Sequence, residues 1–352
     1  MSKPGKTLLD SQLIASIKQD NNFDFIRFFL AYSVLFNHFS TLTETDPFWF
    51  VSGGFRVKGF FIISGFLVMF SFLRSPDPFT FFRKRIQRIM PAYILIIIVC
   101  SLLGLLLTSF SYKEYINSPQ LISYLFYNII TLNFLNPYLP GVFENNPLHS
   151  VNASLWTIKV ELMLYLTIPI IYWFIKRYNK LACLIIIYVL SFIYSTTFNH
   201  LDDITQNPVY GFLKRQFPGQ LMYFCSGIIL LIYFSTFKKY MKYIFPICIL
   251  LFIDRDLFLL KIVEPIALAS IIVTVAYGIK YLPVFNRFGN FSYGIFLVHY
   301  PIMQTFIHFG LDKYSLLLTL SATVVLSTLL GILSWKYIEK PCLYTPDKIK
   351  NS

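Results

Sequence analysis

Two histidines of this chain lie inside long apolar stretches, where an imidazole is a candidate for acid–base chemistry. His38 ends the stretch that begins at Phe23, and His299 lies in the stretch Ser292–Pro301. A histidine within an apolar spanning segment by default faces a polar cavity or a proton relay, and a neutral imidazole can accept a hydroxyl proton near neutral pH. We therefore expect His38 to be functional rather than a packing residue.

Arg27 shares the first apolar stretch with His38 and lies eleven residues before it. On a helix, eleven steps return to within about 20° of the same face and rise roughly 16 Å. Both side chains can therefore line one pathway. Arg27 is also close enough to the predicted cytoplasmic boundary for its charge to reach water by snorkelling, and position alone leaves both interpretations open.

A basic loop, Phe81–Pro91, carries Arg83, Arg85 and Arg88. If the loop contains a helical turn, Arg85 and Arg88 share a face because they are three residues apart, and they could bind a phosphate group through paired hydrogen bonds. The alternative is a topology determinant that contacts anionic lipid. Spacing alone does not decide between these two roles.

A Gly-rich block, Ser52–Phe66, leads into the second apolar stretch and contains Ser64. Small residues let helices approach each other closely. Helix packing is therefore the simpler interpretation of this block.

The segment Ser154–Tyr165 places two charges, Lys159 and Glu161, in an apolar stretch. A charge at bilayer depth costs about 2.5–3.5 kcal/mol, so both need a partner or an aqueous cavity. Lys159 and Glu161 are two residues apart and do not face each other on a helix, whereas Glu161 and Tyr165 are four apart and do. The residues to which we assign an orienting or structural role are Glu161, Tyr165, Trp156, Ser64 and His299.

The composition indicates which solvent these segments require. Of the 352 residues, 56% are hydrophobic and 13% are charged, which is more apolar surface than one water-soluble core can bury. The bilayer is therefore the predicted solvent, and a spanning helix of about 20 apolar residues makes its backbone hydrogen bonds internally. The alternating segments of about ten residues that are typical of barrel strands are missing.

The apolar runs predict an all-α fold, a polytopic transmembrane bundle of about ten helices. We interpret Leu121–Leu135 as an interfacial or re-entrant helix, because counting it as a span would place Lys176, Arg177 and Lys180 outside. The seventh predicted span is short. The predicted spans are residues 23–43, 57–73, 91–110, 152–175, 181–198, 216–235, 240–253, 258–279, 289–309 and 315–337.

The net charge of +13 falls mainly in loops predicted to face the cytoplasm. Both chain ends are predicted to be cytoplasmic, and this positive-inside bias is favoured over nucleic-acid binding. The predicted parts are a cytoplasmic segment 1–22 without a signal peptide, a transmembrane domain 23–340 and a cytoplasmic tail 341–352. Five cysteines without CxxC spacing, and no HExxH motif, predict neither a disulfide framework nor a metal site.

Taken in order, these motifs resemble acyltransferase family 3, a family of membrane O-acyltransferases. Each motif is weak alone, and their order along nearly the whole chain carries the resemblance. The matches are the Arg27-to-His38 spacing preceded by Asp24, the block from Gly53 to Phe66, the loop Arg83–Pro91, the segment Leu155–Tyr165, the segment Ser292–His299 and the closing Glu339-Lys340-Pro341.

The resemblance implies a multi-pass enzyme of the bacterial cytoplasmic membrane. It would move an acyl group from cytoplasmic acyl-CoA to a hydroxyl of an extracytoplasmic glycan, without a metal. Acetyl-CoA is the expected donor, with succinyl and longer acyl groups open, and capsule, exopolysaccharide, O-antigen or a smaller glycoside all fit as the acceptor. His38 would be the essential catalytic residue with Arg27 as its motif partner, and Arg83, Arg85 and Arg88 would belong to the acyl-CoA side.

The sequence leaves two mechanisms open and allows comparison with two other function classes. His38 could act as a general base in direct transfer, or a transient acyl-enzyme could form. A secondary transporter or flippase for a lipid-linked sugar would more often show inverted repeats or broken helices in matching halves, and the sequence shows neither. A structural scaffold does not explain Arg27, His38 and Glu161. Lys58 departs from the family, many of whose members carry an acidic residue there, which weakens a functional role for this position.

Overall fold

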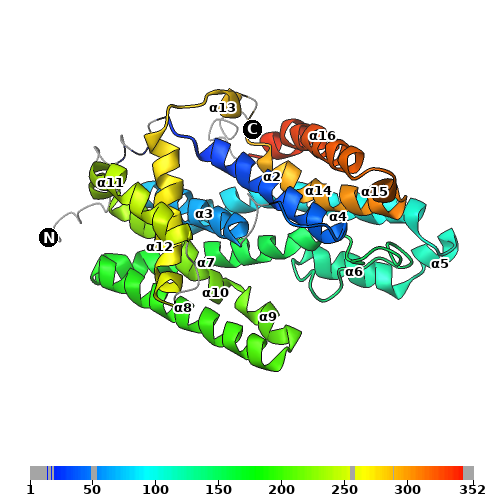
Figure 1. The fold of residues 1–352 in the computed structure, drawn as a ribbon, viewed down its shortest axis with the longest axis horizontal. Coiled ribbons are helices and arrows are strands. Elements are labelled where there is room, and N and C mark those ends of the chain that lie inside the picture. The colour runs from blue at the N-terminus through cyan, green and yellow to red at the C-terminus, as the bar shows by residue number, and fades with distance from the viewer. Residues whose placement is uncertain are drawn as a thin grey trace. The chain divides into compact units, whose positions relative to one another are not determined.

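The structure is a computed structural model that describes residues 14, 17, 20–48, 54–253, 258–287 and 289–343. All regular elements within these residues are helices, which confirms the predicted all-α class (Figure 1). The longer helices are α2 (Phe23–Leu42), α3 (Phe55–Arg74), α4 (Pro78–Leu107), α7 (Trp156–Arg177), α8 (Lys180–Thr205), α10 (Phe217–Ile232), α11 (Phe234–Ile253), α12 (Phe258–Gly278), α14 (Ser292–His308) and α16 (Leu316–Ser334). The shorter ones are α5 (Tyr112–Ile116), α6 (Pro119–Ile129), η2 (Ala153–Leu155), α9 (Pro208–Lys214), α13 (Val284–Arg287), α15 (Leu311–Tyr314), η3 (Trp335–Glu339) and α17 (Lys340–Cys342).

Several of these helices have the length and composition of membrane spans. Within the described residues six helical segments qualify, and a seventh is added if Pro208–Ile232 and Phe234–Leu251, which are bent by 106° relative to each other, form one span. Each of the ten predicted spans corresponds to one of the longer helices. However, α14 has 17 residues, and α2 carries Asp24, Arg27 and His38 within its 20 residues. The multi-pass architecture is supported, and the total of about ten spans stays a prediction.

The basic segment Phe81–Pro91, predicted from the sequence to be a loop, is helical. It forms the first turns of α4, a continuous helix of 30 residues with Pro91 in its interior. Asp77 lies just before the helix and accepts hydrogen bonds from Thr80, which lower the pKa of the Asp77 carboxyl. The prediction was wrong because it took Pro91 as a boundary, whereas spanning helices tolerate an interior proline.

Two further helices differ in length from their predictions. α6 has eleven residues and ends at Ile129, short of the predicted Leu135. At about 1.5 Å per residue it is roughly half as long as the hydrocarbon core is thick, so it is not a spanning helix. α11 starts at Phe234 rather than at residue 240 and has 20 residues, so the short seventh span was predicted too short.

Close packing divides the chain into two units, and each is described by itself. The first consists of Met1–Ile26, Val57–Phe81 and Val160–Pro283. In this unit α3 and α10 cross in close contact, because a Cβ atom added to Gly65 would lie 2.0 Å from the Phe224 carbonyl oxygen. A Cβ atom on Gly227 would lie 2.2 Å from the Ile62 carbonyl oxygen. The packing interpretation of the Gly-rich block is therefore confirmed at Gly65, whereas Gly53 lies outside the described residues.

Replacing Gly65 by Ala is expected to destabilise the protein by about 1–3 kcal/mol, because the new methyl group meets backbone rather than a side chain that can move. Gly278→Ala is the matched control, since its Cβ atom would make ordinary contacts of 3.4 Å and longer. Thermal unfolding of both purified variants in detergent measures the difference. Equal stability of the two variants would show that α3 and α10 can separate without loss.

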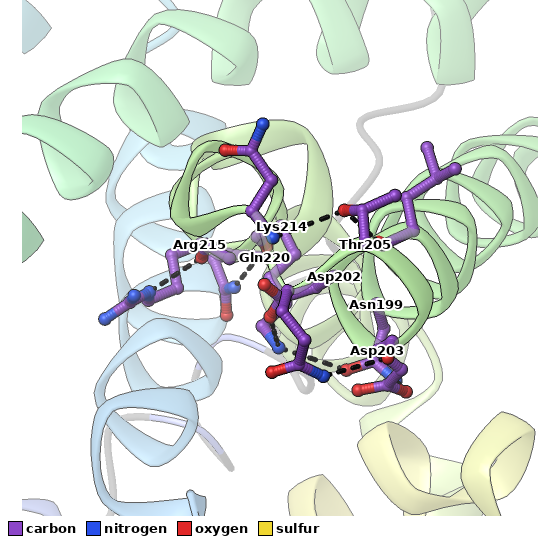
Figure 2. A network of polar contacts seen from close by, with 11 residues as sticks. Asn199, Asp202, Asp203, Thr205, Lys214, Arg215 and Gln220 are labelled. Atoms are coloured by element: carbon purple, nitrogen blue, oxygen red, sulfur yellow. Dashed lines mark hydrogen bonds and ion pairs between the residues drawn. The ribbon is translucent and has the colours of Figure 1, made fainter.

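A network of polar contacts joins the end of α8, the helix α9 and the start of α10 in the first unit (Figure 2). Lys214 Nζ lies 2.8 Å from Asp202 Oδ2 and 3.1 Å from Asn199 Oδ1. Gln220 Nε2 donates to the Lys214 carbonyl oxygen at 3.2 Å. The ion pair is partly exposed, so it contributes little to stability and mainly fixes the short connection between the helices.

The second unit consists of Arg27–Arg56, Phe82–Lys159 and Val284–Ser352. Its helices α14 and α16 lie side by side (Figure 1), and a Cβ atom on Gly294 would lie 2.8 Å from Gly331 Cα. The connection before α7 is fixed to α14, because Asn146 Nδ2 donates to Gln304 Oε1 at 2.8 Å. Helix α14, which carries His299, is therefore in contact both with α16 and with the connection before α7.

Candidate active site

His38 projects from α2 onto two aromatic side chains of α14 in the second unit. Its ring stacks on that of His299, with centroids 5.4 Å apart and planes inclined by 29°. The Tyr300 ring meets it edge to face at 5.1 Å. His38 is half-buried, whereas His299 and Tyr300 are fully buried. Of the two imidazoles, His38 is therefore the more exposed.

The hydrogen bonds of His299 fix the roles of its two ring nitrogens. Nδ1 lies 3.1 Å from the Ile295 carbonyl oxygen, and Nε2 lies 3.3 Å from Ser154 Oγ. A carbonyl oxygen only accepts hydrogen bonds, so Nδ1 carries a proton, and in the neutral imidazole Nε2 then accepts the hydroxyl hydrogen of Ser154. Both nitrogens of His299 are thereby occupied, and its ring forms a fixed wall against which His38 stacks.

The η2 turn places Ser154 opposite His299. Asn152 starts this turn by accepting a hydrogen bond from the Ser154 backbone N–H at 3.1 Å. The Asn152 side-chain amide also donates to the Leu297 carbonyl oxygen at 2.8 Å, which attaches the turn to α14. An asparagine before a helical turn is a favoured cap, because its short side chain bonds the free backbone N–H groups. The sequence thus fixes Ser154 through its neighbour Asn152.

Arg56, in the first turn of α3, adds a positive charge near this cluster. It is close enough to His38 to interact with it electrostatically. Among the residues that the structure describes, no group accepts a hydrogen bond from its buried Nη1 atom. A buried guanidinium nitrogen without an acceptor is costly, and it is a suitable donor for an oxygen of a bound substrate.

The predicted arginine cluster divides into residues with different surroundings. Arg83 is exposed on α4, and Arg85 and Arg88 are half-buried. Arg88 forms an ion pair with Glu339, which is fully buried, and donates to the Asn290 carbonyl oxygen at 3.2 Å. The Arg88 guanidinium also lies 4.9 Å from the Trp335 ring. Arg88 thus has structural contacts in place, and Arg83 is the most exposed of the three arginines.

Glu161, Ser64 and Tyr165 form a separate group in the first unit. Glu161 Oε1 accepts a hydrogen bond from Ser64 Oγ at 3.0 Å, and the Tyr165 hydroxyl donates to the same oxygen. Helical spacing predicts that Glu161 faces Tyr165, and the structure shows this contact. The carboxylate links α7 to α3, and its orienting or structural role stays a prediction.

The other residues singled out from the sequence lie on helices α2, α3 and α7. Arg27 is half-buried in the first turns of α2, and Trp156 is half-buried at the start of α7. Lys159 places its ammonium 4.1 Å from the Phe134 ring centroid, a cation–π contact that offsets its burial. Lys58 pairs with Glu264 at 2.9 Å, so its charge is balanced by a carboxylate from α12.

The structure adds four residues for which the sequence predicts no role. Ser154, Tyr300 and Arg56 surround the two histidines, and Glu339 holds Arg88. All four lie within segments quoted from the sequence, but their contacts join distant parts of the chain and carry no local spacing signal. Within the described residues, no group of three or more His, Cys, Asp or Glu side chains is placed to hold a metal ion.

Comparison with known proteins identifies a family whose profile covers most of the chain. Residues 20–336 match the family profile described as an acyltransferase domain. The chain is 29% identical to nodulation protein 10 of Rhizobium leguminosarum bv. viciae, over 92% of this chain and 93% of that protein. It is 27% identical to the O-acetyl transferase of Shigella phage Sf6, over 92% of this chain and 96% of that protein. No solved structure matches the chain.

Proposed function

The chain belongs to acyltransferase family 3 and is an acyltransferase of the multi-pass membrane type, and from this premise we propose that it moves an acyl group from cytoplasmic acyl-CoA to a hydroxyl of an extracytoplasmic glycan. The observation that supports this most directly is the half-buried His38, stacked on a buried His299 whose ring nitrogens are both occupied. The bacterial cytoplasmic membrane is the proposed location, because acyl-CoA is a cytoplasmic donor.

In the proposed reaction His38 is the general base. Its imidazole takes the proton of the acceptor hydroxyl as the oxygen attacks the thioester carbonyl. The carbon–sulfur bond then breaks, and the leaving CoA thiolate takes the proton from the imidazolium, which regenerates the neutral base. General-base catalysis of this kind contributes about 10²–10⁴ in rate. Arg56 Nη1 is a suitable donor to the oxygen that becomes negative in the transition state. Arg27 lies on the same helix and lines the way to His38 from the donor side.

The name of one relative favours acetyl as the transferred group, because the phage protein is an O-acetyl transferase. Acetyl-CoA is therefore the donor to test first. The defining experiment incubates the purified chain with acetyl-CoA and measures free CoA with and without a surface-glycan extract from the parent strain. CoA release that depends on the extract, with a new O-acetyl signal in the NMR spectrum of the glycan, supports the proposal. Uptake or translocation of glycan without CoA release would instead indicate a transporter or flippase.

We propose that the phosphates of acyl-CoA bind at the basic start of α4, through Arg83 and Arg85, with Arg88 held behind them by Glu339. Changing both Arg83 and Arg85 to Ala is expected to weaken acyl-CoA binding by at least about tenfold, because each charge-assisted hydrogen bond to phosphate is worth roughly 1.5–3 kcal/mol. Calorimetric titration with acetyl-CoA measures the change. The matched control changes the exposed Lys239 and Lys242 to Ala. An equal loss in both double variants would mean that overall charge, rather than this face, holds the donor.

The proposed topology has ten spans with both chain ends in the cytoplasm. It places the exposed Asn145 outside and the exposed Asn179 inside. Single cysteines at these positions, in a chain whose native cysteines are replaced by serine, are expected to react with a membrane-impermeant reagent only at position 145. Labelling at position 179 in intact cells would reverse the assignment.

A further inference from the structure

An apolar groove with a volume of about 490 Å³ lies among α4, α14, α16 and η3 in the second unit. One face of α4 forms a wall of the groove, because the lining residues follow helical spacing. These residues are Ala92, Leu95, Ile96, Val99, Cys100 and Leu103. Across the whole groove only Cys100, Thr305, Ser334 and Tyr337 carry a side-chain heteroatom. The volume is that of a ligand site, and the chemistry suits a hydrocarbon.

The groove has a buried floor and an exposed rim. Ala92, Ile96 and Ile302 are each at most 9% exposed, whereas Leu103 and Leu330 on the rim are 41% and 38% exposed. The rim belongs to helices with the composition of membrane spans. In a bilayer the open side therefore faces lipid, and a chain can enter sideways without crossing water.

The length of the groove fits a chain from one leaflet. Along α4 it runs from Ala92 to Leu103, which at about 1.5 Å per residue is roughly 16 Å. The hydrocarbon core of a bilayer is about 30 Å thick, so the groove is about as long as one leaflet is deep. A chain that spans both leaflets would extend well beyond it.

One end of the groove is basic. Continuing the lining face of α4 by seven residues before Ala92 leads to Arg85. On the other wall the exposed Lys336 places its ammonium 5.0 Å from the ring of Tyr337, which lines the groove, and the exposed Lys340 follows one turn later. These cations suit an anionic head group at the surface of the membrane.

We propose that this groove binds one acyl chain of an anionic glycerophospholipid, with the phosphate of its head group at Lys336 and Lys340. The apolar lining, the one-leaflet length and the basic end select this occupant over a polyprenyl chain or a neutral lipid. The site does not depend on the proposed catalytic function, because lipid binding can be measured without any acyl transfer.

Native mass spectrometry of the full chain in detergent tests the site, with phosphatidylglycerol and phosphatidylcholine of identical acyl chains as probes. The expected result is one retained phosphatidylglycerol with at least about tenfold preference over phosphatidylcholine. Leu330→Trp fills the groove and is expected to weaken this binding by at least about tenfold. Leu329→Trp, one residue away and exposed but outside the lining, is the matched control and should bind as the parent does.

A second pair keeps the test decisive if Leu330→Trp does not fold. Leu103→Trp enters the groove from α4, and Leu102→Trp is its exposed neighbour outside the lining. Changing Lys336 and Lys340 to Gln should reduce the preference for phosphatidylglycerol, whereas changing Lys239 and Lys242 should not.

Three results would overturn the proposal. The first is equal retention of the two lipids by the parent chain, which would show that head-group charge is not recognised. The second is unchanged binding when the groove is filled by tryptophan. The third is displacement of the lipid by palmitoyl-CoA with the same sensitivity to Leu103→Trp, because the groove would then hold the acyl chain of a donor.

Discussion

Replacing His38 by Ala is expected to lower the turnover number by at least about 10²-fold while acyl-CoA affinity stays nearly unchanged. The substitution removes the proposed base and leaves the arginines at the start of α4 in place. Loss of turnover without loss of donor binding is the signature of an interaction made only in the transition state. Steady-state CoA release and calorimetric binding of acetyl-CoA measure the two quantities separately.

Two further variants, Ser154→Ala and His308→Ala, allow the loss of turnover in His38→Ala to be compared with smaller expected losses. Ser154→Ala removes the hydrogen bond to His299 Nε2 but leaves both imidazoles, so its effect should be smaller than that of His38→Ala. His308→Ala changes a histidine that packs on Phe143 and Phe309 at the other end of α14, and it should keep turnover within about threefold of the parent. Near-normal turnover of His38→Ala would remove His38 from the chemistry. Equal losses in all three variants would indicate a disturbed α14 rather than a missing base.

The helices could be predicted from the sequence because the bilayer imposes a strict local rule. A run of about 20 apolar residues must be helical there, and each predicted run corresponds to a helix. The predicted helix boundaries were wrong where a proline or a group of charged residues interrupts the apolar run. Pro91 was taken to end a helix that continues through it, and the charges of Lys238, Lys239 and Lys242 hid the first turns of α11.

The candidate site was only partly predictable, because its contacts join elements that are far apart along the chain. Chemistry and helical spacing single out His38 and place Glu161 against Tyr165. No spacing rule could place the His38 ring on His299, or Ser154 against Nε2 of that ring across 145 residues. Such pairings depend on which helices pack together, and the glycines that permit close packing do not name the partner helix.

The role of Arg88 could not be predicted from sequence spacing either, and this affects the expected site for the donor phosphates. Sequence spacing puts Arg85 and Arg88 on one face and suggests one role for both, namely phosphate binding. The structure pairs Arg88 with Glu339, which lies 251 positions later and is fully buried. A guanidinium already committed to a buried carboxylate is less available to a ligand, so a change at Arg88 affects folding as well as any donor contact.

Changing Glu339 to Ala is therefore expected to destabilise the protein by about 3–5 kcal/mol, because it leaves the Arg88 guanidinium in a largely buried position without its counter-charge. Ser334, whose hydroxyl donates to Glu339 Oε1 at 3.0 Å, also loses its acceptor. Glu339→Gln should have a smaller effect, since an amide oxygen can still accept these hydrogen bonds although it carries no charge. Unfolding of the purified variants in detergent, followed by tryptophan fluorescence, measures the order of stability of the parent, Glu339→Gln and Glu339→Ala.

A double variant separates the structural role of Arg88 from a role in donor binding. Replacing Arg88 by Met and Glu339 by Leu removes both charges together, and an apolar pair of similar volume in a buried site is often as stable as the ion pair. The double variant should therefore be more stable than Glu339→Ala. If it also binds acetyl-CoA as the parent does, Arg88 serves the fold and the donor phosphates rest on Arg83 and Arg85. If it is as unstable as Glu339→Ala, an unpaired charge is not the cause of the loss and the explanation given for the Glu339 change is wrong.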